Sequence, residues 1–362
     1  MTLLLEYLTE GSRIFLSSNK MRFSSKKYVG NAEEICKQVV ADCWNGKFFC
    51  VSTGNFAQFW MRDFGWCVGA LLELEYEKEV QATLKYALNK FKQHGKVTTT
   101  ITPAGKPFDF PNYSVDALPW LIHAIRKSGF VYYTYRDFLN KEIEKYFEKV
   151  INPSTGLVKP EVHFSSIKDF AKRKSGCYDN TVVGMLASHL QGMEGLVNPF
   201  ASFDYPQLLK RHFWTGNYFY DDLSKKEYVA GDANIFPFVL GIVKDKKMLE
   251  KSVQAIRDAG LDEPFPLKYT VLREQGKFIW QEMAMWNYEG NTIWTHMGPL
   301  YIQLVGSVDK TYATELKKRY GHWIEHFGNY LEVFEATGKP YTSPFYVCDR
   351  GMLWAANYLM LK

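Results

Sequence analysis

The stretch VQATLKYALNKF, residues 80–91, repeats its apolar side chains with helical spacing. They recur at i, i+4, i+7 and i+11, namely Val80, Leu84, Ala87 and Phe91. This spacing places them on one face of an amphipathic helix. Residues 143–150 and 316–327 repeat apolar side chains in the same way. The chain is therefore predicted to consist mainly of amphipathic helices.

Loops rich in proline, glycine and aromatic residues separate the predicted helices, for example residues 102–113 and 198–206. Short alternating stretches predict only accessory strands, one at residues 96–101 and a hairpin over 218–222. No charge block or low-complexity linker divides the chain. We therefore expect one domain over residues 1–362, with roughly 10 to 12 helices joined in hairpins.

The arrangement of these hairpins follows from the lack of a sequence repeat. Hairpins that bury one face can stack into an open solenoid or close into a ring, and solenoids repeat with a fixed length of roughly 34 or 40 residues. This sequence has no such period. The predicted fold class is therefore all-α, a closed ring of helical hairpins with minor β-hairpins in its loops. At one end of such a ring, the loops converge on a single cavity.

Charge and hydropathy exclude several classes of function. The 44 Lys and Arg residues exceed the 39 Asp and Glu residues by only 5, without a basic run, so we expect no nucleic-acid partner. The longest apolar stretch, residues 236–243, is far shorter than the roughly 20 residues of a membrane span. The first residues lack the basic segment of a signal peptide. We therefore expect a cytoplasmic protein with no membrane partner and with reduced cysteines, since none lies in a CxxC pair.

Signatures of cofactors and metals are missing from the sequence. It has no glycine-rich phosphate loop, no dinucleotide fingerprint and no spaced set of metal ligands, so we expect no cofactor and no metal. Aromatic residues are abundant instead, at 16% of the chain. This is more than packing alone usually requires, which suggests a ring-shaped ligand.

One aromatic cluster, FWMRDFGW at residues 59–66, contains a charged pair. Arg62 and Asp63 form either a buried salt bridge at a helix start or a polar clamp in a ligand pocket, and the spacing leaves both open. Guanidinium and carboxylate groups make paired hydrogen bonds with neighbouring hydroxyls. Tryptophan faces in turn suit the apolar faces of sugar rings. The cluster is therefore suited to a carbohydrate substrate.

Further acidic residues lie before or at the start of apolar helices. Each has an ordinary structural alternative as a helix cap, a first-turn charge or a solvated surface acid. These residues are Asp116 in NYSVDALPW, Asp169 and Asp179 in IKDFAKRKSGCYDN, Glu289 in WNYEGNTIW, Glu332 and Glu335 in YLEVFEATG, and Asp349 in DRGMLW.

Taken in this order over residues 55–360, the motifs resemble the alkaline and neutral invertases and the amylo-1,6-glucosidase part of glycogen-debranching enzymes. Those families are inverting glycosidases built on an (α/α)6 barrel of six helical hairpins, an architecture shared with glucoamylases and trehalase-like enzymes. The resemblance implies an inverting glycoside hydrolase that acts on a glucoside or small oligosaccharide. Its substrate would contain α-linked glucose, as in trehalose, a maltooligosaccharide or a 1,6-branch.

The resemblance also implies a catalytic pair. It makes Asp169 the general acid and Glu332 the general base. Inverting enzymes hold these two carboxyl groups about 6.5 to 9.5 Å apart across the scissile bond. Asp179 is the reserve for the acid, and Glu335 and then Asp349 are the reserves for the base.

Sugar binding is expected from residues around this pair. The resemblance assigns it to Arg62, Asp63 and Asp116. Glu289 is expected to join them, with tryptophans as stacking platforms, namely Trp60, Trp120, Trp214 and Trp294.

Two other functions remain open at the level of the sequence. Sugar epimerases use the same barrel with a histidine pair as acid and base, and His322 and His326 lie at i, i+4 on one predicted helix. The chain could also be a non-catalytic carbohydrate-binding barrel. Product analysis separates these alternatives from a hydrolase.

Overall fold

The computed structural model describes residues 2–23 and 26–362. Within them, twelve helices alternate between an outer and an inner layer, preceded by the long helix α1 (Thr2–Phe23). The outer helices are α2 (Ala32–Cys43), α4 (Glu77–His94), α6 (Arg136–Val150), α8 (Tyr205–Phe213), α10 (Lys246–Asp258) and α12 (Lys310–Phe327). The inner helices are α3 (Met61–Glu73), α5 (Ala117–Ser128), α7 (Cys177–Leu190), α9 (Gly231–Val239), α11 (Met297–Gly306) and α13 (Ala355–Leu359).

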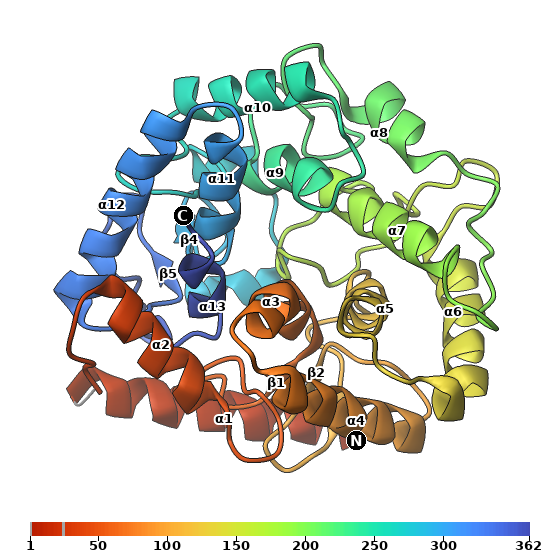
Figure 1. Cartoon of the computed structure of the whole chain (residues 1–362), viewed down its shortest axis with the longest axis horizontal. Helices are drawn as coiled ribbons and strands as arrows, with labels where there is room; N and C mark the ends of the chain where they lie inside the picture. Colours follow the sequence, from red (N-terminus) through yellow and green to blue (C-terminus); the bar gives the residue numbers. More distant parts are fainter. Residues whose placement is uncertain (1, 24–25) are drawn as a thin grey trace.

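The inner helices form a closed ring. Each of α3, α5, α7, α9 and α11 contacts the next, α11 contacts α13, and α13 packs against α3, which closes the circle. Figure 1 shows this ring surrounded by the outer helices, with α12 next to α2. The structure therefore confirms the predicted fold class, an (α/α)6 barrel.

The two layers differ in how their residues are buried. The predicted helices at residues 80–91, 143–150 and 316–327 are confirmed as parts of α4, α6 and α12, which all belong to the outer layer. An outer helix buries one face and exposes the other, which produces an amphipathic pattern. In α7, by contrast, nearly every residue is buried, because an inner helix touches neighbours on all sides.

Strands are short and lie in the loops, as expected. Strands β1 (Phe59–Trp60), β2 (Thr100–Ile101) and β3 (Pro107–Phe108) form one antiparallel sheet, and β4 (Ile293–Trp294) pairs with β5 (Val333–Phe334). Short 3₁₀ helices add η1 (Tyr133–Tyr135), η2 (Arg273–Gln275) and η3 (Trp280–Met285). The strand expected at 96–101 is confined to β2.

The hairpin expected over residues 218–222 is wrong. This segment makes only isolated bridges, Trp214 with Phe219 and Gly176 with Asp222. The Thr215 hydroxyl accepts hydrogen bonds from the backbone N–H groups of residues 217 and 218, which holds the chain in a turn. The turn leaves too few residues for a paired strand.

The first turns of the inner helices gather acidic residues at one end of the barrel. Asp63, Asp116, Asp179 and Asp232 lie at or next to the N-termini of α3, α5, α7 and α9. Negative charge is favourable there because the helix dipole is positive at its N-terminus. The loops that lead into the inner helices therefore bring a set of carboxylates together.

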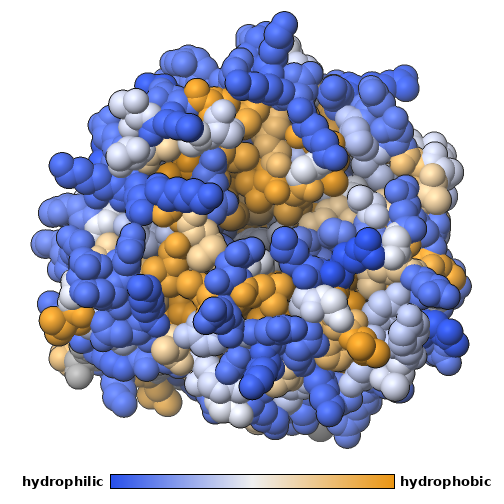
Figure 2. All heavy atoms as spheres, viewed as in Figure 1, coloured by the Kyte–Doolittle hydropathy of each residue, from blue (hydrophilic) through white to orange (hydrophobic). Residues whose placement is uncertain are grey.

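The surface of the barrel is mostly hydrophilic, as in globular proteins generally. Figure 2 shows hydrophilic residues over most of one face, with hydrophobic residues gathered around a hollow near its middle. In the described part of the chain no helix is both long and apolar enough to span a bilayer. All six cysteines are buried and unpaired.

Candidate active site

A cavity of about 530 Å³ lies at the end of the barrel where the inner helices begin. Its walls come from α1, from the segments that enter α3, α11 and α13, and from the loops around residues 108–110 and 167–170. Aromatic side chains cover much of it, including Trp60, Trp66, Trp294 and Trp354. Its volume falls within the roughly 300–1,000 Å³ typical of small-molecule sites.

Arg62, in the first turn of α3, is the charged centre of the cavity wall. Its guanidinium lies 3.4 Å from the Asp116 carboxylate, 3.3 Å from Asp169 and 3.9 Å from Asp63. It also donates a hydrogen bond to the carbonyl oxygen of Ser166. Because the side chain is buried, the three acids compensate its charge. Arg62 therefore joins the starts of α3 and α5 to the loop that precedes α7.

Of the three acids around Arg62, only Asp116 does not line the cavity. It is fully buried and accepts hydrogen bonds from the hydroxyl groups of Ser114 and Tyr178. The expectation that Asp116 binds sugar is therefore corrected, because this carboxylate holds Arg62 from behind. Asp63 does reach the cavity and accepts a hydrogen bond from Trp354 Nε1 at 3.0 Å. Burial raises the pKa of Asp63 to about 6.

Asp169 and Glu289 form a carboxyl pair in the cavity wall. The backbone N–H groups of Asp169 and Phe170 each donate to a Glu289 carboxyl oxygen at 2.7 Å. Asp169 itself accepts a hydrogen bond from the hydroxyl of Ser165. Burial, followed by the negative charge of Asp169, raises the pKa of Glu289 to about 8. The loop before α7 is thus held to the loop before α11 by one buried carboxyl group.

Glu332 enters the cavity from the segment next to β5. Its carboxyl group accepts hydrogen bonds from the Tyr288 hydroxyl, from the Tyr346 hydroxyl at 2.6 Å and from the backbone N–H of Asp349 at 2.9 Å. Three donors on one carboxyl group fix its orientation. Burial, followed by the nearby charge of Asp349, raises the pKa of Glu332 to about 8.

Four buried nitrogen atoms in this wall have no hydrogen-bond partner among the described residues. They are Trp60 Nε1, Arg62 Nε, Trp66 Nε1 and His296 Nδ1. The His296 ring stacks on Trp66 with centroids 4.4 Å apart, and burial lowers its pKa far below the ordinary range, so the ring is neutral. Unpartnered buried polar groups are costly and rare. Their concentration in one cavity indicates a polar ligand with several hydrogen-bonding groups.

The reserve carboxylates lie outside the cavity wall. Asp179 accepts hydrogen bonds from Ser166 and Arg173. Glu335 is partly exposed in the turn after β5. Asp349 is fully buried and accepts backbone N–H groups from residues 55, 56 and 350, which organises the surrounding loops. The structure thus brings Asp169 and Glu332 to the cavity and none of their reserves.

Two of the four predicted tryptophan platforms are corrected. Trp60 and Trp294 line the cavity, but Trp120 and Trp214 do not. Trp120 is buried between α3 and α7, where its Nε1 donates to the Tyr178 hydroxyl at 3.0 Å. Trp214 packs on Phe219 in a separate apolar cluster. Both rings stabilise the barrel from positions that a cavity ligand does not reach.

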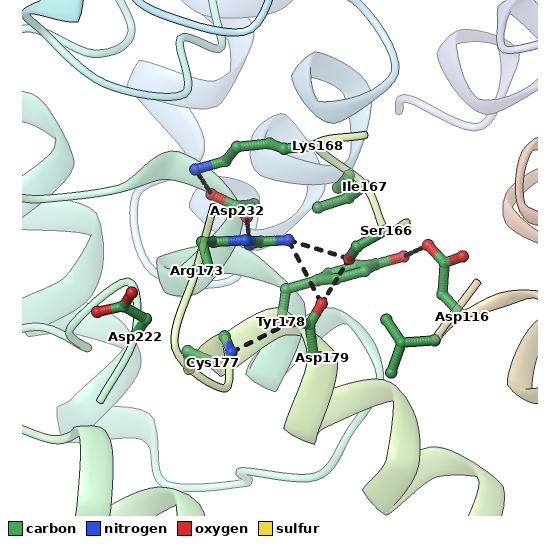
Figure 3. A network of polar contacts seen from close by, with 12 residues as sticks. Asp116, Ser166, Ile167, Lys168, Arg173, Cys177, Tyr178, Asp179, Asp222 and Asp232 are labelled. Atoms are coloured by element: carbon green, nitrogen blue, oxygen red, sulfur yellow. Dashed lines mark hydrogen bonds and ion pairs between the residues drawn. The ribbon is translucent and has the colours of Figure 1, made fainter. Parts of the chain in front are cut away.

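A second charged network lies beside the cavity, behind the 167–170 loop. Lys168 and Arg173 are buried and both contact Asp232, at 3.2 and 2.9 Å. Arg173 also lies 3.3 Å from Asp179, and Lys168 lies 3.4 Å from Asp221. Figure 3 shows Asp232 between the two cations, with Arg173 extended toward Ser166 and Asp179. Since each charge has a partner, the network holds the loop that carries Asp169 and makes Asp179 structural.

Several cavity residues were missed in the sequence. Tyr288 precedes Glu289, and Trp66 and Trp354 lie inside motifs that had already been selected. Their neighbours could therefore have indicated them. His296 likewise lies two residues after Trp294, whereas Tyr346 has no comparable signal, because only the closed ring brings it to the cavity. Within residues 2–23 and 26–362, no group of three His, Cys, Asp or Glu side chains is arranged to hold a metal ion.

Comparison with known proteins identifies the fold through structure alone. No family model and no curated protein matches the sequence. A solved glycosidase matches with a TM-score of 0.66 and 11% identity, over 91% of this chain and 95% of its own. A bacterial glucoamylase complexed with acarbose has a TM-score of 0.64 and 14% identity, over 91% of this chain and 55% of that one.

A mannosylglycerate hydrolase from Thermus thermophilus is similar over nearly its whole length. It has a TM-score of 0.60 and 10% identity, over 91% of this chain and 99% of that one. Identities this low carry information about the fold and not about the substrate. The chain therefore has the (α/α)6 barrel fold of these six-hairpin glycosidases.

Proposed function

We propose that the chain is an inverting glycoside hydrolase with a single catalytic domain over residues 1–362. The observation that carries the proposal is the composition of the cavity, where Asp169 and Glu332 enter from separate segments of an aromatic wall. The same wall holds both buried nitrogen atoms without hydrogen-bond partners and carboxyl acceptors. A sugar ring, with hydroxyl groups that both donate and accept, satisfies such a wall.

In the proposed reaction, Asp169 donates a proton to the glycosidic oxygen and Glu332 accepts a proton from the attacking water. Burial and the negative charge of Asp169 raise the pKa of Glu289 to about 8, so near neutral pH the proton of this pair is held by Glu289, next to Asp169. Asp169 is the more exposed of the two, at 9% against 4%, and is the better placed to deliver the proton.

Glu332 has the surroundings that a base for water requires. The hydroxyl groups of Tyr288 and Tyr346 and the N–H of Asp349 hold its carboxyl group without a salt bridge. A base paired with a cation would be less basic, because the cation favours its ionised form. Glu332 therefore keeps a high proton affinity, with a pKa near 8.

We propose α-linked glucose as the glycone. A glycosidase in complex with glucose covers 91% of this chain with a TM-score of 0.65. The choice of sugar follows from the resemblance of the motifs over residues 55–360 to debranching enzymes, since the shared fold does not itself identify the substrate. Arg62 and Asp63 would hold the sugar, with Trp60 and Trp294 against its apolar faces.

The position of the histidine pair does not favour an epimerase. His322 and His326 lie on the outer helix α12, where both are exposed, and neither lines the cavity. A pair in that place cannot act on a sugar bound next to Glu332.

Product analysis by proton NMR tests the proposal. The protein is incubated with trehalose, maltooligosaccharides and branched dextrins, and the anomer first released is recorded. We expect glucose with an inverted anomeric centre from at least one substrate. Retention of configuration would contradict the inverting mechanism. An altered stereocentre without hydrolysis, or binding without turnover, would contradict the hydrolase.

A further inference from the structure

The mouth of the cavity exposes large apolar side chains from three segments. In α1, Leu8 is 61% exposed and Phe15 40%. On the loop before α13, Phe345 is 59% exposed, and Met283 in η3 is 74% exposed. Leu8, Phe15 and Phe345 line the cavity directly. Contiguous exposed apolar surface of this kind commonly marks a binding site.

The three segments contact one another around the mouth. The rings of Phe15 and Phe345 lie 6.5 Å apart, centroid to centroid. The Tyr341 hydroxyl donates to the carbonyl oxygen of Trp286 at 2.9 Å, and the Ser343 hydroxyl donates to that of Ala284 at 3.4 Å. The apolar residues therefore belong to one rim that is continuous with the cavity.

The charged side chains of α1 near the rim are already paired. Glu10 and Arg13 of α1 lie 2.8 Å from each other, and Arg13 also donates to the carbonyl oxygen of Asn55. The unpartnered nitrogen atoms of the cavity, such as the Trp66 Nε1 donor and His296 Nδ1, belong instead to buried residues of its floor. A second sugar at the rim would find few hydrogen-bond partners, so the polarity of the site falls from the floor to the mouth.

We propose that the substrate is a glycoside with an apolar aglycone, an alkyl or aryl group, which lies against Leu8, Phe15 and Phe345 while the sugar occupies the floor. This inference rests on the proposed glycosidase function and specifies its leaving group. Burying a CH₂ group contributes about 0.8 kcal/mol. An alkyl chain that covers even part of the rim is therefore bound measurably more tightly than a methyl group.

Hydrolysis of methyl and hexyl α-glucosides tests the inference, because the two leaving alcohols are chemically similar and differ in apolar area. We expect kcat/KM for the hexyl glucoside to exceed that for the methyl glucoside by at least about tenfold, the effect of burying roughly two CH₂ groups. Phe15→Ser and Phe345→Ser should each bring this ratio toward one. Thermal melting of the variants verifies that they fold.

Val131→Ser provides a matched control, because Val131 is 70% exposed and does not line the cavity. It should leave the hexyl-to-methyl ratio at the wild-type value. Equal kcat/KM for the two glucosides would overturn the apolar aglycone and leave the hydrolase intact, as would hydrolysis of maltose but of neither alkyl glucoside. If no glycoside is hydrolysed at all, the proposed function fails and this inference fails with it.

Discussion

Arg62 lies 3.3 Å from Asp169, so that a buried cation on α3 holds an acid that comes from the loop before α7. The same guanidinium lies 3.4 Å from Asp116, which is fully buried. Its three acidic neighbours depend on this one positive charge. The arrangement fixes the proposed general acid relative to the barrel.

Replacing Arg62 with methionine should therefore lower the free energy of unfolding and abolish activity. Removing one partner from a buried ion pair costs about 3–5 kcal/mol, because the remaining charge is left uncompensated. Urea denaturation measures the loss. Arg319→Met is the control, since Arg319 is partly exposed and pairs with Glu263 and Glu315 at the surface. We expect a change of at most about 1 kcal/mol there, and an equal loss in both variants would contradict the central role of Arg62.

The proposed catalytic pair is tested by amide substitutions. Asp169→Asn and Glu332→Gln should each lower kcat by about 10²- to 10⁴-fold, the usual contribution of a general acid or base. Sugar affinity measured by calorimetry should change little. Glu335→Gln is a close control, because Glu335 lies three residues from Glu332 but outside the cavity wall. Near-normal turnover by Asp169→Asn would reject its role as the acid.

The fold could be predicted from sequence to the extent that its helices are amphipathic. The confirmed helices α4, α6 and α12 are outer helices, whose polar and apolar faces alternate with the helical period. Inner helices such as α7 and α11 are buried on nearly all sides, so their sequences do not alternate between apolar and polar faces and periodicity does not identify them. Closure of the ring depends on contacts between α3 and α13, almost 300 residues apart in sequence, which no local pattern encodes.

The site was predictable where a single motif carries the chemistry. Three residues of the FWMRDFGW motif, Trp60, Arg62 and Asp63, line the same cavity. Trp120 could not be distinguished from them, because its indole N–H is satisfied by Tyr178, a residue from another helix. The surroundings of Glu332 come from Tyr288 and Tyr346, on two separate loops. Such long-range partners follow from the folded ring and not from residue spacing.

The pH dependence of activity should follow the pKa of Glu332. Since a general base acts in its ionised form and this pKa is raised to about 8, kcat/KM should rise with pH toward about 8, and it should fall at higher pH because the proton held by Glu289 beside the acid is lost. The hydrogen bond from Tyr288 favours the ionised carboxylate. Tyr288→Phe should therefore move the acidic limb of the profile to higher pH.

Rate profiles between pH 5 and 10 measure this shift. Tyr330→Phe is a suitable control, because Tyr330 is buried but bonds to Tyr320 and to the carbonyl oxygen of Thr295, outside the cavity. Its profile should match the wild type. A shift of the Tyr288→Phe limb to lower pH would show that the hydroxyl does not stabilise the ionised base.

The same raised pKa predicts how stability changes with pH. Folded Glu332 binds its proton more tightly than the unfolded chain does, with a pKa of about 8 against an ordinary value of 4.5. Proton binding by Glu332 therefore stabilises the folded state relative to the unfolded chain. This contribution to the free energy of unfolding is fully present below about pH 4.5 and is lost as the pH rises through about 8. Glu332→Gln carries no charge. Its amide can still accept from Tyr346 and the N–H of Asp349 and can donate to Tyr288.

Melting temperatures of Glu332→Gln and the wild type should therefore diverge as the pH rises. At pH 9 we expect the variant to melt about 2 °C or more above the wild type, the shift that roughly 1 kcal/mol produces in a chain of this size. Near pH 4.5 the difference should vanish. A variant that is less stable than the wild type at pH 9 would mean that the buried charge is fully compensated.

Because Trp66 Nε1 has no hydrogen-bond partner, we expect its removal to weaken sugar binding more than it weakens the folded structure. Trp66 Nε1 is buried in the cavity wall without a hydrogen-bond partner, whereas Trp120 Nε1 donates to the Tyr178 hydroxyl outside the cavity. Trp66→Phe removes a donor that the free protein leaves unsatisfied, so it should destabilise the protein less than Trp120→Phe, which also loses a hydrogen bond. If that donor binds a sugar hydroxyl, the loss of one hydrogen bond should weaken sugar binding by about 5- to 10-fold.

Trp120→Phe is the matched substitution with the reverse outcome. It leaves the buried Tyr178 hydroxyl without its donor, which should destabilise the protein by about 1–3 kcal/mol. Sugar affinity should remain at the wild-type value, because Trp120 does not line the cavity. Calorimetric titration with glucose and urea denaturation of both variants measure the two quantities. Unchanged glucose affinity in Trp66→Phe would exclude this indole as a ligand for the sugar, and its N–H would then have to be satisfied by water.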